Sequence, residues 1–212
     1  MGAKTWMLVL SDNDARSAFA AKAPLNKLET DRQVRALFPG EVLELIGEGS
    51  LSYTCPPDNE IHAACYPGVT LIAAKEFGID YPSRLAQRFS SAGSIATLHA
   101  MHSAVDWFAY AVWKDGVLLR SLSLSPDSGI LEDIGQRMAF EEPYWSGGHS
   151  AVDDEEDGAY PFPFHPLELG EAALNDLFGY QLEGVLDAAL LDPDSIPLLC
   201  YRRSRSAWWK FW

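Results

Sequence analysis

The stretch SIATLHAMHSAVDWFAYAVWKDGVLLRSLSL, residues 94–124, decides the fold. Its apolar runs predict three successive strands over residues 95–101, 106–113 and 117–124. Asp115 and Gly116 join the last two strands, and this pair favours a tight hairpin because it tolerates positive φ. The middle strand is apolar on both faces, which is typical of a strand covered on each side. We therefore expect an antiparallel meander at the centre of a sheet, in which the third strand turns Leu118, Leu122 and Leu124 to one face.

The rest of the chain adds elements in an order typical of an α+β protein. Strands are expected over residues 4–10, 61–66, 69–74 and 198–201, with a short apolar run over 42–46. Helices are expected over 15–22, 30–38, 83–89 and 166–178, and an irregular segment over 130–160. The sequence thus predicts a single α+β domain over residues 1–201, a mainly antiparallel sheet flanked by several helices. A basic, Trp-rich tail over 202–212 follows.

The composition excludes several classes of protein. Of the 212 residues, 48% are hydrophobic and 12% aromatic, a content that a disordered chain lacks. With 30 acidic and 16 basic side chains the net charge is −14, which opposes binding to nucleic acid. The chain has neither a run of ~18 apolar residues nor a signal-peptide pattern at its amino terminus. We therefore expect a cytoplasmic protein with no nucleic-acid and no membrane partner.

The cysteines and the usual catalytic motifs give no sign of a cofactor. Cys55, Cys65 and Cys200 are odd in number, which argues against a disulfide framework. A metal site formed by Cys55, His62 and Cys65 would lack a CxxC pair and a fourth ligand. The sequence also has no GxGxxG, GxxxxGK[ST], GxSxG or HExxH motif. We expect no metal and no cofactor.

The most chemically suggestive residues lie between the first two strands of the meander. His99, His102 and Asp106 would share one face of a helix and could then hold a metal ion. In a strand His99 and His102 point to opposite faces, and the segment is better interpreted as a strand followed by a turn. In that turn His102, Ser103 and Asp106 would hydrogen-bond to the backbone.

His165 is the other candidate for acid–base chemistry. It precedes Pro166 at the start of an expected helix, near Glu168 and Glu171. If the irregular segment folds over the sheet, His165 could form a polar pocket with Glu132, Glu141 or Glu142. The simpler interpretation is a helix start with favourable carboxylates in its first turns.

The carboxyl-terminal segment combines basic and aromatic side chains. Arg202, Arg203, Arg205 and Lys210 alternate with Trp208, Trp209, Phe211 and Trp212. Such a segment is typical of a docking element for a partner protein, a membrane or single-stranded nucleic acid. The interpretation that we favour is that the tail folds back and buries its aromatic rings on this domain or on a second subunit, and docking to a partner protein comes next.

Four phrases carry a resemblance to a known family. They are MGAKTW at residues 1–6, LHAMHSAVDWFAYAVW at 98–113, RSLSLSPDSG at 120–129 and PFHPLELGEAA at 163–173. On these phrases the chain resembles an uncharacterised family of actinobacterial proteins of about this length. The resemblance implies a bacterial cytosolic protein of unknown activity and transfers no catalytic residues. The meander is also loosely similar, at the level of fold alone, to small acidic immunity proteins.

Two functions are compatible with these patterns. The first is a non-enzymatic protein-binding module of the immunity or accessory type, with a basic protein partner or a second copy as its ligand. The alternative is a small hydrolase or metal-dependent enzyme that uses His99, His102 or His165 with nearby carboxylates. The absence of a catalytic spacing favours the first.

Overall fold

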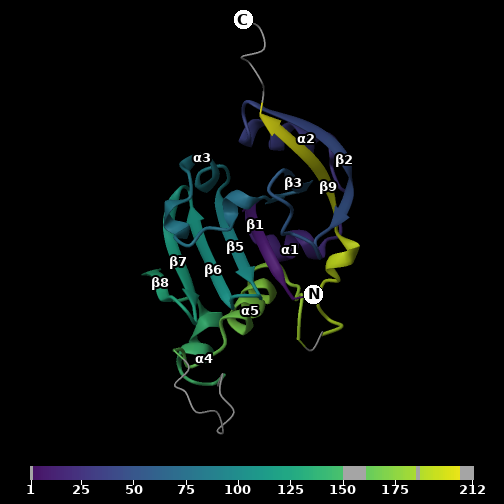
Figure 1. Cartoon of the computed structure of the whole chain (residues 1–212). Helices are drawn as coiled ribbons and strands as arrows, with labels where there is room; N and C mark the ends of the chain where they lie inside the picture. The colour runs from purple at the N-terminus through teal and green to yellow at the C-terminus, as the bar shows by residue number, and fades with distance from the viewer. Residues whose placement is uncertain (1, 150–160, 185–186, 206–212) are drawn as a thin grey trace, which may run out of the picture.

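A computed structural model describes residues 2–149, 161–184 and 187–205 of the chain (Figure 1). The strands are β1 (Lys4–Ser11), β2 (Glu41–Ser50), β3 (Glu60–Tyr66), β4 (Val69–Ala73), β5 (Ile95–His102), β6 (Trp107–Lys114), β7 (Val117–Ser125), β8 (Gly129–Gly135) and β9 (Pro197–Arg205). The α-helices are α1 (Ala15–Ala20), α2 (Lys27–Leu37), α3 (Gln87–Ser90), α4 (Glu142–Trp145) and α5 (Pro166–Phe178). Short 3-10 turns are η1 (Lys75–Phe77), η2 (Pro82–Arg84), η3 (Ala139–Glu141) and η4 (Pro193–Ser195). In the described part of the chain, no helix is long and apolar enough to cross a membrane.

All nine strands belong to one sheet in the order β2-β9-β3-β4-β1-β5-β6-β7-β8, and neighbouring strands run antiparallel. The consecutive strands β5 to β8 lie side by side, as the stretch 94–124 predicts for the first three (Figure 1). The hairpin between β6 and β7 turns through Asp115 and Gly116 at φ of 50° and 76°. The expected use of positive φ at this turn is confirmed.

Strand β6 shows how the sheet forms its core. Every residue from Trp107 to Trp113 is buried, and alternate residues join two different apolar clusters. Phe108, Tyr110 and Val112 pack in the cluster to which α1 and α5 contribute. Trp107, Ala109, Ala111 and Trp113 pack in the cluster to which α2 and α3 contribute. The prediction that β6 is apolar and covered on both faces is confirmed.

Helix α5 begins and ends where the sequence predicts. Pro166 occupies the first turn, where its missing N–H costs nothing, and the His165 ring accepts a hydrogen bond from the Leu167 N–H at 3.3 Å. Gly179 ends the helix at φ 81°, a left-handed conformation that glycine adopts without strain. These two ends fix the position of α5 on the sheet and therefore the position of His165.

The structure corrects three expectations. Residues 129–145 are not irregular, because β8, η3 and α4 lie within them. The apolar run over 42–46 is part of the ten-residue strand β2. The last strand extends past Tyr201 to Arg205, so the backbone of Arg202–Arg205 pairs with β2 and is not free tail. For the three strands β2, β8 and β9, backbone hydrogen bonds to a neighbouring strand stabilise an element whose own sequence pattern is weak.

Candidate functional site

Residues 99–106 form the end of a strand and a turn. β5 ends at His102, and Asp106 adopts φ 46° in the turn before β6. The two histidines are three residues apart on a strand and lie on opposite faces of the sheet. The ring of His99 contacts Phe108 and Phe178, while that of His102 stacks on Trp6. The expected strand and turn are confirmed, and the helical metal site is excluded.

His99 is a buried structural residue. Its side chain is fully buried, with Nδ1 2.7 Å from the Thr5 hydroxyl and Nε2 3.0 Å from the Gly170 carbonyl oxygen. Because the carbonyl can only accept, Nε2 carries the proton and Nδ1 accepts from Thr5. Burial lowers the pKa of the ring to about 4. His99 thus fixes α5 to the sheet as a neutral ring with no nitrogen left for substrate.

Three other candidates are also held by local partners. The His102 ring accepts a hydrogen bond from the Ala104 N–H at 3.2 Å, and the Ser103 N–H donates to the Ala3 carbonyl at 3.2 Å. Glu132 accepts hydrogen bonds from the N–H of Ser83 at 2.9 Å, from its hydroxyl at 2.6 Å and from the Ser121 hydroxyl. None of these three side chains contacts another member of the candidate set within the described residues.

His165 and Asp106 are the two candidates that the fold brings together. Nε2 of His165 lies 3.7 Å from a carboxylate oxygen of Asp106, while Nδ1 accepts from the Leu167 N–H. With Nδ1 acting as the acceptor, the proton of a neutral ring is on Nε2 and faces the carboxylate. A general base needs a free lone pair, so this arrangement does not leave His165 ready to take a proton from water.

A cleft of about 620 Å³ opens beside this pair, along the first turns of α5. Glu171 on its wall accepts a hydrogen bond from the Leu182 N–H at 2.8 Å, while its second carboxylate oxygen is buried with no hydrogen-bond partner. Burial raises the pKa of Glu171 to about 7. The other lining residues are Tyr144, His149, His165, Leu167, Glu168, Ala172, Asn175, Gln181, Glu183 and Gly184. The cleft is acidic and has one carboxyl group suited to proton exchange near neutral pH.

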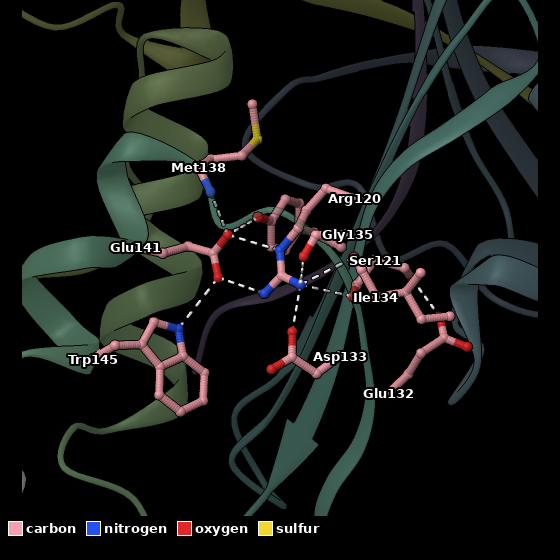
Figure 2. A network of polar contacts seen from close by, with 10 residues as sticks. Arg120, Ser121, Glu132, Asp133, Ile134, Gly135, Met138, Glu141 and Trp145 are labelled. Atoms are coloured by element: carbon pink, nitrogen blue, oxygen red, sulfur yellow. Dashed lines mark hydrogen bonds and ion pairs between the residues drawn. The ribbon is translucent and has the colours of Figure 1, made fainter.

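The densest polar network lies elsewhere, around Arg120 of β7 (Figure 2). Its buried guanidinium donates to Glu141 through Nε at 2.9 Å and Nη2 at 2.7 Å, and through Nη1 to Asp133. Glu141 accepts three further hydrogen bonds, from the Tyr110 hydroxyl, the Met138 N–H and the Trp145 ring N–H. Burial by itself raises the pKa of Glu141, but the hydrogen bonds from Arg120 and Tyr110 outweigh it and the pKa is lowered.

The sequence predicts this network only in part. It indicates Glu141 as a pocket partner of His165 and does not single out Arg120, whereas the structure pairs Glu141 with Arg120. Both groups are saturated with hydrogen bonds, so they attach η3 and α4 to the sheet and leave no atom for a ligand. Tyr144 of α4 donates to the Glu168 carbonyl at 3.2 Å, which places the network behind one wall of the cleft.

The remaining candidates concern metals and the tail. No group of three or more His, Cys, Asp or Glu residues within the described ranges could hold a metal ion. Cys55, Cys65 and Cys200 are free thiols whose pKa values are raised by burial, which disfavours the reactive thiolate. Trp208, Trp209, Phe211 and Trp212, the predicted docking residues, lie outside the described residues.

The fold defines a class: a protein built on one nine-stranded antiparallel sheet, in which the buried His99 joins α5 to the sheet. A family model described as "Family of unknown function (DUF6928)" matches residues 5–201. The chain belongs to this family, so the predicted membership in an uncharacterised family is confirmed. No curated protein and no solved structure matches the chain.

Proposed function

We propose that this protein is a non-catalytic module that binds another protein through the outer strands of its sheet. One observation carries the proposal. Of eleven large apolar side chains exposed in the described part of the chain, seven lie on the outer strands β2 and β8 or on β7 beside β8. They are Val42, Leu45, Ile46, Val117, Leu119, Ile130 and Ile134. Exposed apolar side chains on the outer strands of a sheet are typical of protein-interaction surfaces.

The charge of the chain supports a basic partner. A net charge of −14 attracts basic proteins over long range and accelerates their association. The immunity or accessory type of protein, which binds a partner and catalyses nothing, fits both features. Thr5 and Gly170 occupy both ring nitrogens of His99, and Nδ1 of His102 and of His165 accepts a backbone hydrogen bond, which also favours binding over catalysis.

The experiment is a capture from the cells that make this protein. The native chain is compared with a variant in which Val42, Leu45, Ile130 and Ile134 are all replaced by lysine. These four side chains are 43–55% exposed, so the changes leave the core intact. We expect the native chain to retain at least one protein that the variant loses. Capture of the same proteins by both would contradict the proposal.

The contribution of the tail is tested in the same experiment. Removal of residues 206–212 keeps all of β9, whereas a cut at 204 would shorten the strand. If the aromatic side chains of the tail dock a partner, the truncated chain loses that protein while the edges remain intact. If the captured proteins are unchanged, the tail is not a docking element.

A small hydrolase is the second candidate, and Glu171 is the observation that favours it. This carboxyl group lines the cleft and has a pKa of about 7, which suits a general acid or base. The test is the hydrolysis of p-nitrophenyl esters by the native chain, by Glu171→Gln and by the control Glu168→Gln. An enzyme would lose its activity in Glu171→Gln alone, and absence of hydrolysis by the native chain would count against this function.

A further inference from the structure

The two outer strands of the sheet are chemically different. β2 pairs only with β9, and β8 pairs only with β7, within the described residues. Each strand therefore has one edge whose backbone groups have no neighbouring strand. Such an edge is a template for a further strand unless side chains or other elements protect it.

β8 carries protection of the kinds that natural sheets use. Its two acidic side chains have partners on opposite faces of the sheet. Glu132 accepts hydrogen bonds from Ser83 of η2, and Asp133 pairs with the buried Arg120, as Figure 2 shows for the second pair. Arg120 also donates to the Ile134 carbonyl at 3.0 Å. The strand is short, with seven residues, and its pairing with β7 is interrupted by a bulge. Charged side chains, a strand shorter than β2 and a bulge all oppose the addition of another strand.

β2 lacks most of these devices. It is ten residues long and contains neither proline nor lysine, and Leu43 is its one buried residue. Val42 and Leu45 are each 55% exposed, and a single bulge near Ile46 interrupts the pairing with β9. Arg35 of α2 donates to the Leu43 carbonyl at 3.3 Å, so one backbone group of the strand already has a side-chain partner. At its ends, the Glu41 N–H donates to the Phe38 carbonyl at 3.4 Å and the Ser50 carbonyl accepts from the Tyr53 N–H at 3.1 Å. Between these ends, no second strand pairs with β2 in the described chain.

The side chains of β2 indicate what could lie beside it. The strand carries three glutamates, Glu41, Glu44 and Glu48, and no basic residue. Glu41 lies 3.8 Å from Arg203 and Glu48 pairs with Lys27, whereas Glu44 has no ion-pair partner among the described residues. Opposite charges and apolar pairs across neighbouring strands stabilise a sheet, and like charges destabilise it.

We propose that β2 binds an extended segment of a partner protein, rich in lysine or arginine and in apolar residues, which adds to the sheet as a tenth strand. Backbone hydrogen bonds provide the affinity, and the glutamates and exposed apolar side chains select the sequence. This inference rests on the proposed function and names the surface and the chemistry of the partner. A second copy of the chain fits less well, because pairing β2 with itself brings six glutamates together on two chains that each carry a net charge of −14.

The experiment uses the full chain and fluorescently labelled decapeptides, with binding measured by anisotropy. The probe alternates lysine and valine. One control alternates glutamate and valine. A second control is the lysine–valine peptide with every backbone amide methylated, so that neither of its edges can donate hydrogen bonds to β2. We expect the probe to bind and both controls to bind at least about tenfold more weakly. For the methylated peptide this is the effect of losing two hydrogen bonds or more, and for the glutamate peptide it is repulsion by the acidic strand.

Two matched variants separate the site from the overall charge. V42K/L45K places two lysines on β2, and I130K/I134K places two on β8 at residues of similar exposure. We expect V42K/L45K to weaken binding of the probe about tenfold and I130K/I134K to change it less than about twofold. Equal effects of the two variants, or equal binding of the methylated peptide, would overturn the inference, because attraction between charges would then explain the binding.

Two further outcomes would overturn the inference in ways that can be told apart. Sedimentation that shows a dimer dissociated by V42K/L45K would make a second copy the occupant of β2. If the probe does not bind while the four-lysine variant still loses a captured protein, the proposed function stands and the assignment to β2 falls. If neither experiment gives an effect, both fail.

Discussion

Glu141 and Glu171 are two glutamates withdrawn from solvent on the same side of the sheet, and they are opposite in chemistry. Glu141 is fully buried and accepts hydrogen bonds from Arg120, Tyr110, Met138 and Trp145, so its pKa is lowered in spite of its burial. Glu171 accepts one hydrogen bond from Leu182, leaves one oxygen without a partner, and has a pKa raised to about 7. The number of donors, and not the depth of burial, therefore decides which glutamate is a fixed anion and which can exchange a proton.

The largest effect on stability is expected from removing the charge of Glu141, the glutamate that is saturated with hydrogen bonds. Glu141→Gln removes the charge that faces Arg120 and leaves a guanidinium that is 1% exposed with Asp133 as its remaining anion. We expect the free energy of unfolding to fall by about 3–5 kcal/mol, the usual cost of leaving one member of a buried ion pair. Urea denaturation of the native chain and the variant at pH 7 measures this difference in the free energy of unfolding.

A double variant serves as the control for this prediction. Replacing Arg120 by methionine and Glu141 by leucine removes both charges and should cost less than Glu141→Gln alone. A double variant that is less stable than the single one would show that the hydrogen bonds, and not the unpaired charge, stabilise this region.

A gain of stability, and not a loss, is expected when Glu171 is neutralised. The folded pKa of Glu171, about 7, lies above its ordinary value of 4.5, so the folded state binds more protons than the unfolded state between these values. The stability that this group contributes is present below pH 4.5 and is lost as the pH rises toward 7. Glu171→Gln cannot ionise, so it should be more stable than the native chain by up to about 3 kcal/mol at pH 8 and equal to it near pH 4.5. Glu168→Gln, at an exposed residue of the same helix, should show no such crossover.

His99 sharpens this comparison because its pKa is shifted in the other direction. Burial lowers the pKa from 6.5 to about 4, so the unfolded state binds the extra proton and stability falls as the pH drops from 6.5 toward 4. In the native chain this slope and that of Glu171 oppose each other between pH 4.5 and 6.5. As the pH falls from 6.5 to 4.5, the free energy of unfolding of Glu171→Gln should therefore decrease by about 2 kcal/mol more than that of the native chain. In the double variant Glu171→Gln/His99→Gln, we expect this additional loss of stability on acidification to disappear. If the loss persists, titratable groups other than His99 cause it.

The sequence predicted the centre of the sheet better than its edges or its polar groups. Strands β5 to β7 carry continuous apolar runs and an Asp-Gly turn, so their own residues specify them. β8 reads Gly-Ile-Leu-Glu-Asp-Ile-Gly, and its two acids pair with Ser83 and Arg120, outside the strand. No local pattern reveals those partners. One signal was available: Arg120 falls on the same alternation as Leu122 and Leu124, and a charge on a buried face requires an opposite charge. The pairing of His165 with Asp106 joins residues far apart in the chain and could not be read from spacing.

The smallest effect is expected at the exposed margin of the saturated site. Asp133 also pairs with Arg120, but its side chain is 33% exposed, so water already screens the interaction. Asp133→Asn keeps the shape of the side chain, and Glu141 still neutralises the guanidinium. We expect a loss of about 1 kcal/mol or less, which 1 M salt reduces further, against no loss in Asp127→Asn on the neighbouring turn. A loss of stability as large as that of Glu141→Gln would mean that Arg120 needs both carboxylates. The total charge around the guanidinium, more than the number of donors to each glutamate, would then explain the difference between Glu141 and Glu171.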